Sequence, residues 1–324
     1  MKVLAGDIGG TNARLAIAEI GYGAPRITKE QRYPSGEAPG LAPIVRRFLD
    51  GSGEKVERAC FGIAGPVVDG ECRTPNLPWT VNARELARDI GIPRTSIIND
   101  FVAAAYGVGC LGPGDLVTLQ AGRAAEHGTI ALIGAGTGLG EGFVVWDGTR
   151  YRVHPSEGGH ADFAADDEAM WRLRQSLLDE WGRVSWERVL SGPGLAQLYR
   201  YLASSHFAPE RPDVRREMAD GDPAAAVTKH ALAEDDPLSI KALEIFVAAY
   251  GAQAGNLALT VLATGGVYLA GGIAPRIVAK LRDGTFIRAF RNKGRLAGLM
   301  ERIPVHVIVS PDVGLLGSAR AAAE

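Results

Sequence analysis

Two glycine-rich turns, each enclosed by apolar segments, constrain the fold of this chain more than any other feature of its sequence. The first lies in "VLAGDIGGTNARLAI" (residues 3–17), and the second lies in "TIALIGAGTGLGEGFVVWDG" (residues 129–148). Each segment has the pattern of a buried strand, a tight turn and a second strand. Their likeness predicts a duplicated strand–turn–strand unit, one in each of two domains, although glycine-rich hairpins can also resemble one another by coincidence.

The rest of the chain predicts an α/β fold. A length of 324 residues suits two domains, and strands mixed with helices indicate mixed sheets covered by helices. We expect the domains to meet across a cleft, because no low-complexity linker separates the two halves. Further strands are expected at residues 58–67, 95–100, 266–273 and 303–310, and helices at residues 38–49, 82–91, 166–182, 192–204, 223–233, 237–263, 274–283 and 314–323.

Charge and composition exclude several classes of partner. The formal net charge is −2 and the 35 basic residues are scattered, so we expect no binding to nucleic acid or to a membrane surface. Residues 250–275 carry no charge, but polar residues and glycine pairs interrupt them, which favours a buried helix, a turn and a buried strand over a membrane span. Three cysteines without a CxxC pair, and a short apolar run before Asp7, predict a cytoplasmic protein without a signal peptide.

The two turns have the residue types of a phosphate-binding site. Gly9 and Gly10 let backbone N–H groups approach an anion, and Thr11 and Asn12 add side-chain donors. Asp7 fits beside a phosphate only if Mg²⁺ lies between them. The second turn, residues 134–140, has similar donors and no acid, so the pair predicts a triphosphate site. The alternative is two tight hairpins without a ligand, and neither turn matches a Walker A loop or a convincing dinucleotide fingerprint.

Polar side chains elsewhere suit an uncharged, hydroxyl-rich ligand. They are the Asn99–Asp100 pair at the end of an expected strand, the Glu157 and His160 pair around two glycines, Glu187, and Asn76 in a proline-rich loop. Carboxylates accept hydrogen bonds from hydroxyl groups, while amides and imidazoles can donate to them. Three or four such bonds, each contributing roughly 1.5–3 kcal/mol, suffice to bind a sugar.

Each of these residues also has a structural explanation. Asp100 is a possible N-cap of the next helix, and Glu157 with His160 a possible metal-ligand pair without a third ligand. Glu187 is a possible surface helix residue, and Asn76 a turn former beside a packing residue, Trp79.

The chain resembles a known family in several motifs together. The segments "GDIGGTNARLA", "INDF", "GAGTGLG", "SEGGHADF", "ERVLSGPGL" and "LAGGI" occur in the order and at the spacings typical of the bacterial glucokinase family, in the hexokinase/actin-like ATPase superfamily. The resemblance runs from Gly6 to the C-terminal helix. It implies a two-domain actin-like ATPase (ribonuclease H-like) fold with the active site in the interdomain cleft. The small domain would comprise residues 1–110 plus about 304–324, and the large domain residues 111–303.

The resemblance also implies roles for individual residues. The ATP phosphates and the adenosine would be bound by Gly6, Asp7, Ile8, Gly9, Gly10, Thr11, Asn12, Gly136, Thr137, Gly138, Gly271 and Gly272. Asp7 would also bind Mg²⁺, directly or through water. The sugar would be bound by Asn76, Asn99, Asp100, Glu157, His160 and Glu187. No structural zinc is expected, because the cysteine-rich segment that relatives carry after the Glu–His pair is absent, and a homodimer is expected.

The function implied is ATP-dependent phosphorylation of glucose to glucose 6-phosphate, with Asp100 as the general base. Two alternatives stay open at this point. One is a kinase for a related hexose or an N-acetylhexosamine, since a single changed hydroxyl contact redirects specificity. The other is a non-catalytic sugar sensor, against which stand Asp7, Asp100 and both turns.

Overall fold

The computed structural model describes residues 1–75 and 77–324. It divides into two compact units, the first formed by Met1–Leu116 with Val309–Glu324 and the second by Val117–Ile308. The domain boundaries implied by the resemblance, 1–110 plus about 304–324 and 111–303, remain a prediction.

The first unit contains a five-stranded sheet with the strand order β3-β2-β1-β4-β8. Strands β1, β2 and β3 pair antiparallel, whereas β1, β4 and β8 run parallel. The strands are β1 (Lys2–Ile8), β2 (Asn12–Glu19), β3 (Arg26–Pro34), β4 (Arg58–Ile63) and β8 (Arg94–Asn99). The strands expected around the first turn and at residues 58–67 and 95–100 are therefore confirmed, while β3 was not predicted.

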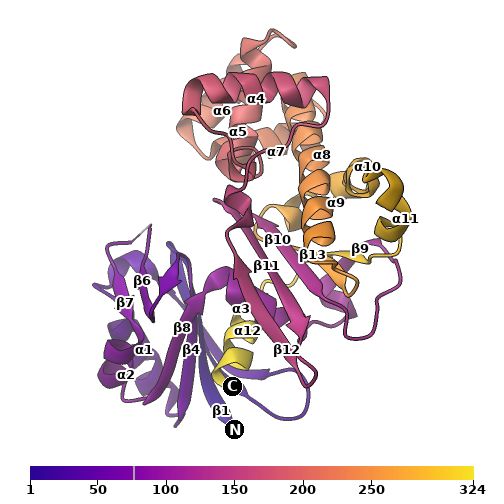
Figure 1. Cartoon of the computed structure of the whole chain (residues 1–324). Coiled ribbons are helices and arrows are strands. Elements are labelled where there is room, and N and C mark those ends of the chain that lie inside the picture. Colours follow the sequence, from indigo (N-terminus) through magenta and orange to yellow (C-terminus); the bar gives the residue numbers. More distant parts are fainter. Residues whose placement is uncertain (76) are drawn as a thin grey trace. The chain divides into compact units, whose positions relative to one another are not determined.

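Helices cover both faces of this sheet (Figure 1). Side chains alternate along β1, so Leu4 and Ile8 pack with α1 (Leu41–Ser52) and α2 (Ala83–Ile90), while Val3 and Ala5 pack with α12 (Val313–Ala322). Helix α3 (Asp100–Val108) packs along α12. Asn82 is the N-cap of α2, because its side chain accepts hydrogen bonds from the backbone N–H groups of Arg84 and Glu85.

A small three-stranded sheet, which the sequence did not predict, follows β4. It consists of β5 (Val67–Val68), β6 (Glu71–Arg73) and β7 (Thr80–Asn82). Trp79 before β7 is 3% exposed, and its Nε1 donates to the Ala38 carbonyl over 3.1 Å, so its expected packing role is confirmed. Asn76 lies outside the described residues.

The second unit repeats the strand order of the first. Its sheet has the order β12-β11-β10-β13-β14-β9, antiparallel from β12 to β10 and parallel from β10 to β14. The strands are β9 (Leu116–Gln120), β10 (Ile130–Ala135), β11 (Leu139–Trp146), β12 (Tyr151–Ser156), β13 (Gly266–Ala270) and β14 (Val305–Ile308). Each sheet thus begins with a three-stranded antiparallel meander and continues in parallel strands, which confirms the predicted duplicated design.

Most helices of the second unit surround α8, whose side chains are buried on nearly all sides (Figure 1). Residues 250–275 form the end of α8, a turn and β13, as expected, and no described helix combines the length and apolarity that crossing a membrane requires. The helix expected at 274–283 is instead a 3-10 turn of residues 274–277 followed by the short helix α9. Three helices, α6, α10 and α11, were not predicted. The helices are α4 (Glu168–Trp181), α5 (Gly192–Ser204), α6 (Pro212–Asp220), α7 (Pro223–Leu232), α8 (Pro237–Thr260), α9 (Val278–Leu281), α10 (Thr285–Arg291) and α11 (Ala297–Met300).

Candidate functional site

The first glycine turn is a tight hairpin between β1 and β2. Gly9 N donates to the Asn12 carbonyl over 2.9 Å, which closes the turn. Buried Ser35 braces it, since its backbone N donates to the Thr11 carbonyl over 2.9 Å and its Oγ to the Gly9 carbonyl over 2.8 Å. Gly9 and Gly10 are half-buried and Thr11 is exposed, so the backbone at the tip is within reach of a ligand.

Asp7 lies near the end of β1, directly before this hairpin. Burial raises the pKa of its carboxyl, and the positive charges of Arg14 and Arg32 oppose that rise. Among the described residues, no hydrogen bond or ion pair engages this carboxylate. A half-buried carboxylate of this kind fits Mg²⁺, which proteins typically bind through one or two carboxylates together with substrate phosphates. The neighbouring Gly6 and Ile8 are buried in the strand, so only their backbone could contribute to nucleotide binding.

Asn99 and Asp100 lie where β8 ends and α3 begins. Asn99 is the N-cap of α3, because its Oδ1 accepts hydrogen bonds from Phe101 N over 2.8 Å and Val102 N over 3.3 Å. Its Nδ2 donates to the Gly65 carbonyl over 2.9 Å. The alternative explanation of Asp100 as the helix cap is therefore wrong, and Asp100 is instead the first residue of α3.

The Asp100 carboxyl is electrostatically unusual. The residue as a whole is exposed, but surrounding protein atoms desolvate its carboxyl. This desolvation is the main reason why its pKa rises from the ordinary value of 3.8 to about 6, and the negative charge of Asp7 adds to it. The hydrogen bond from Phe101 N to Oδ1, at 2.9 Å, opposes the rise. A carboxylate with a pKa moved toward neutrality is suited to accept a proton.

The second glycine turn joins β10 and β11, which also pair antiparallel. Gly136 N donates to the Gly138 carbonyl over 2.8 Å, and Gly192 N donates to the Gly136 carbonyl over 2.8 Å. Leu139 N donates to Glu187 Oε2 over 2.9 Å. Gly138 cannot be replaced without displacing Glu187, because a Cβ at this position would collide with the Glu187 carboxylate.

Gly271 and Gly272 lie beside this second turn. Gly271 has a φ of +80°, in the left-handed region, and a Cβ there would come within 2.5 Å of the Ala135 carbonyl oxygen. Ile273 N donates to the same carbonyl over 3.2 Å. The structure therefore brings Gly136, Gly138 and the Gly271–Gly272 pair together within the second unit.

Glu157, His160 and Glu187 also come together in the second unit. His160 Nε2 lies 3.9 Å from Glu157 Oε2, and His160 Nδ1 lies 3.8 Å from Glu187 Oε1. Glu187, in a 3-10 turn of residues 186–188, is half-buried rather than a surface helix residue. In the part of the chain that the structure describes, no cluster of three or more His, Cys, Asp or Glu side chains could hold a metal ion.

Backbone hydrogen bonds join the segment that follows His160 to the segment around Glu187. Trp186 N donates to the Ala161 carbonyl and Phe163 N to the Val184 carbonyl, both over 3.0 Å. Arg183, which no pattern in the sequence indicates, donates from Nη2 to the His160 carbonyl over 2.8 Å and pairs with Asp162. No local sequence signal distinguishes Arg183 from other surface arginines.

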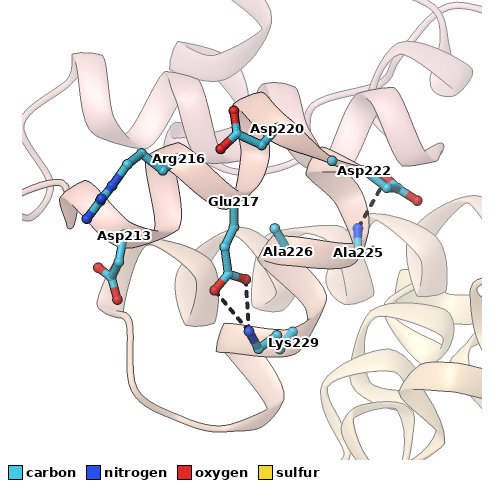
Figure 2. Close-up of a pocket in the computed structure, with 9 residues that line it drawn as sticks. Asp213, Arg216, Glu217, Asp220, Asp222, Ala225, Ala226 and Lys229 are labelled. Carbon is cyan, nitrogen blue, oxygen red and sulfur yellow. Dashed lines mark hydrogen bonds and ion pairs between the residues drawn. The ribbon is translucent and has the colours of Figure 1, made fainter.

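A surface hollow lies between α6 and α7, apart from all of these residues. Figure 2 shows that charged side chains line it, among them Asp213, Glu217 and Lys229. Lys229 Nζ lies 2.9 Å from Glu217 Oε2. None of the predicted site residues lines this hollow.

Comparisons with known proteins agree with the motifs. The sequence profile of the Glucokinase family matches residues 4–324. The glucokinase of Trichormus variabilis is 44% identical over 337 residues, covering 99% of this chain and 98% of that protein. A crystal structure of glucokinase from an Antarctic psychrotroph superimposes with a TM-score of 0.89 at 31% identity, covering 99% of this chain and 98% of that one.

More distant structures share the architecture. A ROK family glucokinase from Streptomyces griseus, solved in complex with glucose and AMPPNP, has a TM-score of 0.67 at 22% identity, covering 100% of this chain and 99% of that one. Together with the repeated sheet topology, these likenesses show the two-domain actin-like ATPase fold of sugar kinases. Both the full-length family match and the high identity to a curated relative lead to the same conclusion: the chain belongs to the glucokinase family.

Proposed function

We propose that this chain is a glucokinase that transfers the γ-phosphoryl group of ATP to the 6-hydroxyl of glucose. The observation that carries this proposal is the identity of 44% to a glucokinase along the whole chain. The polar groups around His160 and the carboxylate of Asp100 support it, because both suit a hydroxyl-rich substrate without a charge.

The nucleotide would be bound by backbone groups of the glycine turns. In the first unit we assign this role to Gly6, Asp7, Ile8, Gly9, Gly10, Thr11 and Asn12, and in the second to Gly136, Thr137, Gly138, Gly271 and Gly272. Asp7 would hold Mg²⁺ directly or through water, and the bound ion would neutralise negative charge on the phosphates. The hairpins fix the donors before the nucleotide arrives, so little reorganisation is required.

Asp100 would act as the general base. Its carboxylate accepts the proton of the sugar hydroxyl as the hydroxyl oxygen attacks the γ-phosphorus. The position of Asp100 is set by the Asn99 cap, which fixes the start of α3. Glu157, His160 and Glu187 would bind the other hydroxyl groups, and Asn99 and Asn76 would add amide contacts.

A coupled ADP-release assay with purified protein, Mg-ATP and a panel of sugars tests this function. We expect glucose-dependent ADP release, with weaker activity on mannose, fructose and N-acetylated hexosamines. A preference for one of those sugars would assign a related kinase instead. Glucose binding without ADP release would indicate a sugar sensor. The homodimer implied by the resemblance and the cytoplasmic location predicted from the sequence also remain predictions.

The raised pKa of Asp100 predicts how activity depends on pH. The base works only as a carboxylate, and with a pKa of about 6 that form is lost as the pH falls through this value. We therefore expect kcat/KM for glucose to fall about tenfold for each pH unit below about 6, whereas an aspartate with its ordinary pKa would keep the activity nearly constant down to pH about 4.

Steady-state kinetics between pH 5 and pH 8 measure this profile. The profile is repeated on His160→Gln, because His160 belongs to the proposed sugar site. The inflection near pH 6 should persist in that variant, and its disappearance there would remove Asp100 as its source.

A further inference from the structure

A buried carboxylate in the second unit takes no part in the mechanism above. Glu141 lies in the middle of β11 and is 4% exposed, although its neighbours in the strand are glycines and apolar residues. A carboxylate is costly to bury unless hydrogen bonds compensate for the lost water. The contacts of the Glu141 carboxylate therefore indicate its role.

A chain of hydrogen bonds leads from Glu141 across α8. Glu141 Oε1 accepts from Gln253 Nε2 over 2.7 Å, and Gln253 Oε1 accepts from Asn256 Nδ2 over 3.1 Å. Asn256 Oδ1 accepts from Lys293 Nζ over 2.8 Å. Every donor points toward the carboxylate, from the ammonium group at one end to Glu141 at the other. Such a chain strengthens its members and fixes the rotamer of the carboxylate.

The second oxygen of Glu141 lies against the turn that carries Glu157 and His160. A Cβ on Gly158 would collide with Glu141 Oε2. Ser156, the partner of Glu141 across the β11–β12 pair, accepts a hydrogen bond from Gly158 N at its Oγ over 3.0 Å. Gly158 thus donates a hydrogen bond to Ser156 and packs closely against the Glu141 carboxylate.

We propose that Glu141 is a positioning residue for sugar binding. Its carboxylate, oriented by Gln253, fixes Gly158 and thereby the directions in which Glu157 and His160 leave their turn. The inference rests on the proposed function, in which these two side chains bind glucose. Small displacements of binding groups reduce affinity and rate strongly, so the contact governs how well the sugar is held.

A double-mutant cycle between Glu141 and Gly158 tests the contact. Gly158→Ala places a methyl group against the Glu141 carboxylate and should raise KM for glucose at least tenfold, leaving KM for ATP unchanged. Glu141→Asp withdraws the carboxylate by one methylene and should raise KM for glucose about threefold. The double variant should bind glucose better than Gly158→Ala alone, because the shorter side chain makes room for the methyl group. If the changes in log KM for glucose of the two single variants simply added up in the double variant, the proposal would be overturned.

Gly159→Ala is the matched control. A Cβ on Gly159 would collide with the backbone carbonyl of Leu139 and not with Glu141. Glu141→Asp should therefore give no rescue of Gly159→Ala. If Glu141→Asp lowered KM for glucose equally in Gly158→Ala and Gly159→Ala, it would act by loosening the whole turn. That result would contradict a specific contact between Glu141 and Gly158.

Two further variants separate positioning from stability. Glu141→Gln keeps the shape and the acceptor for Gln253 and should leave KM for glucose at its normal value. Gln120→Leu removes another buried hydrogen-bonded side chain, whose Nε2 donates to the carbonyls of Met300 and Ile303. It should lower Tm without changing KM for glucose. If Gln120→Leu raised KM for glucose as much as Glu141→Asp does, the rise in KM would come from lost stability, and the proposal would fail. The same assay on the wild-type protein tests the proposed function separately. A wild-type protein without activity on glucose would refute that function, whatever the variants show.

Discussion

Replacing Asp100 by asparagine should lower kcat for glucose phosphorylation about a thousandfold. Asparagine has nearly the same shape and can still accept the hydrogen bond from Phe101 N, but it cannot take up the proton of the sugar hydroxyl. Removal of a general base typically costs 10²- to 10⁴-fold in rate. KM for glucose should stay within a few-fold of its normal value, because the amide oxygen still accepts a hydrogen bond.

Steady-state kinetics with glucose and Mg-ATP measure this loss. Asp89→Asn is a suitable control, since Asp89 is an exposed residue of α2 in the same unit that pairs with Arg46 at 3.8 Å. It should keep full activity. A kcat of Asp100→Asn within threefold of normal, with normal glucose binding, would remove Asp100 from the role of base.

The largest loss of stability should follow from Gly317→Ala. Helices α3 and α12 approach so closely that a Cβ on Gly317 would collide with the carbonyl oxygen of Ala103. Because the obstacle is backbone, no side chain can move aside, and α12 must shift. The shift would strain the buried bonds of Ser318, whose Oγ donates to the Gly6 carbonyl over 2.8 Å. We expect a loss of about 3 kcal/mol in the free energy of unfolding, at the upper end of overpacking effects.

Urea denaturation followed by circular dichroism measures this change. Gly109, at the end of α3, provides the comparison, because it has a helical φ of −68° and no neighbouring atom within 4 Å of its Cβ position. Gly109→Ala should be neutral or stabilise the protein by up to about 1 kcal/mol. Equal stability of Gly317→Ala and Gly109→Ala would show that the two helices can separate at no cost.

Much of the candidate site could be predicted from sequence because it consists of local patterns. The turn at Gly9–Gly10 is confirmed, since adjacent glycines between two apolar runs permit few structures other than a hairpin. The repetition of this pattern at residues 129–148 predicted the duplicated topology. The short strands β5, β6 and β7 were missed because segments of two or three residues have no hydrophobic period to recognise.

The sequence by itself determined the two hairpins, the order of most strands and helices, and the family to which the chain belongs. These follow from hydrophobic periodicity and from glycines at turns, which act over a few residues. Only the tertiary structure decided that Asn99 and not Asp100 caps α3, that Glu187 approaches His160, and that Glu141 lies against Gly158. The approach of Glu187 to His160 and of Glu141 to Gly158 depends on how separate segments pack together, which no local pattern encodes. The cap of α3 is local, but only the folded geometry decides which of two neighbouring polar side chains turns back to the helix N–H groups and which is left available for a ligand.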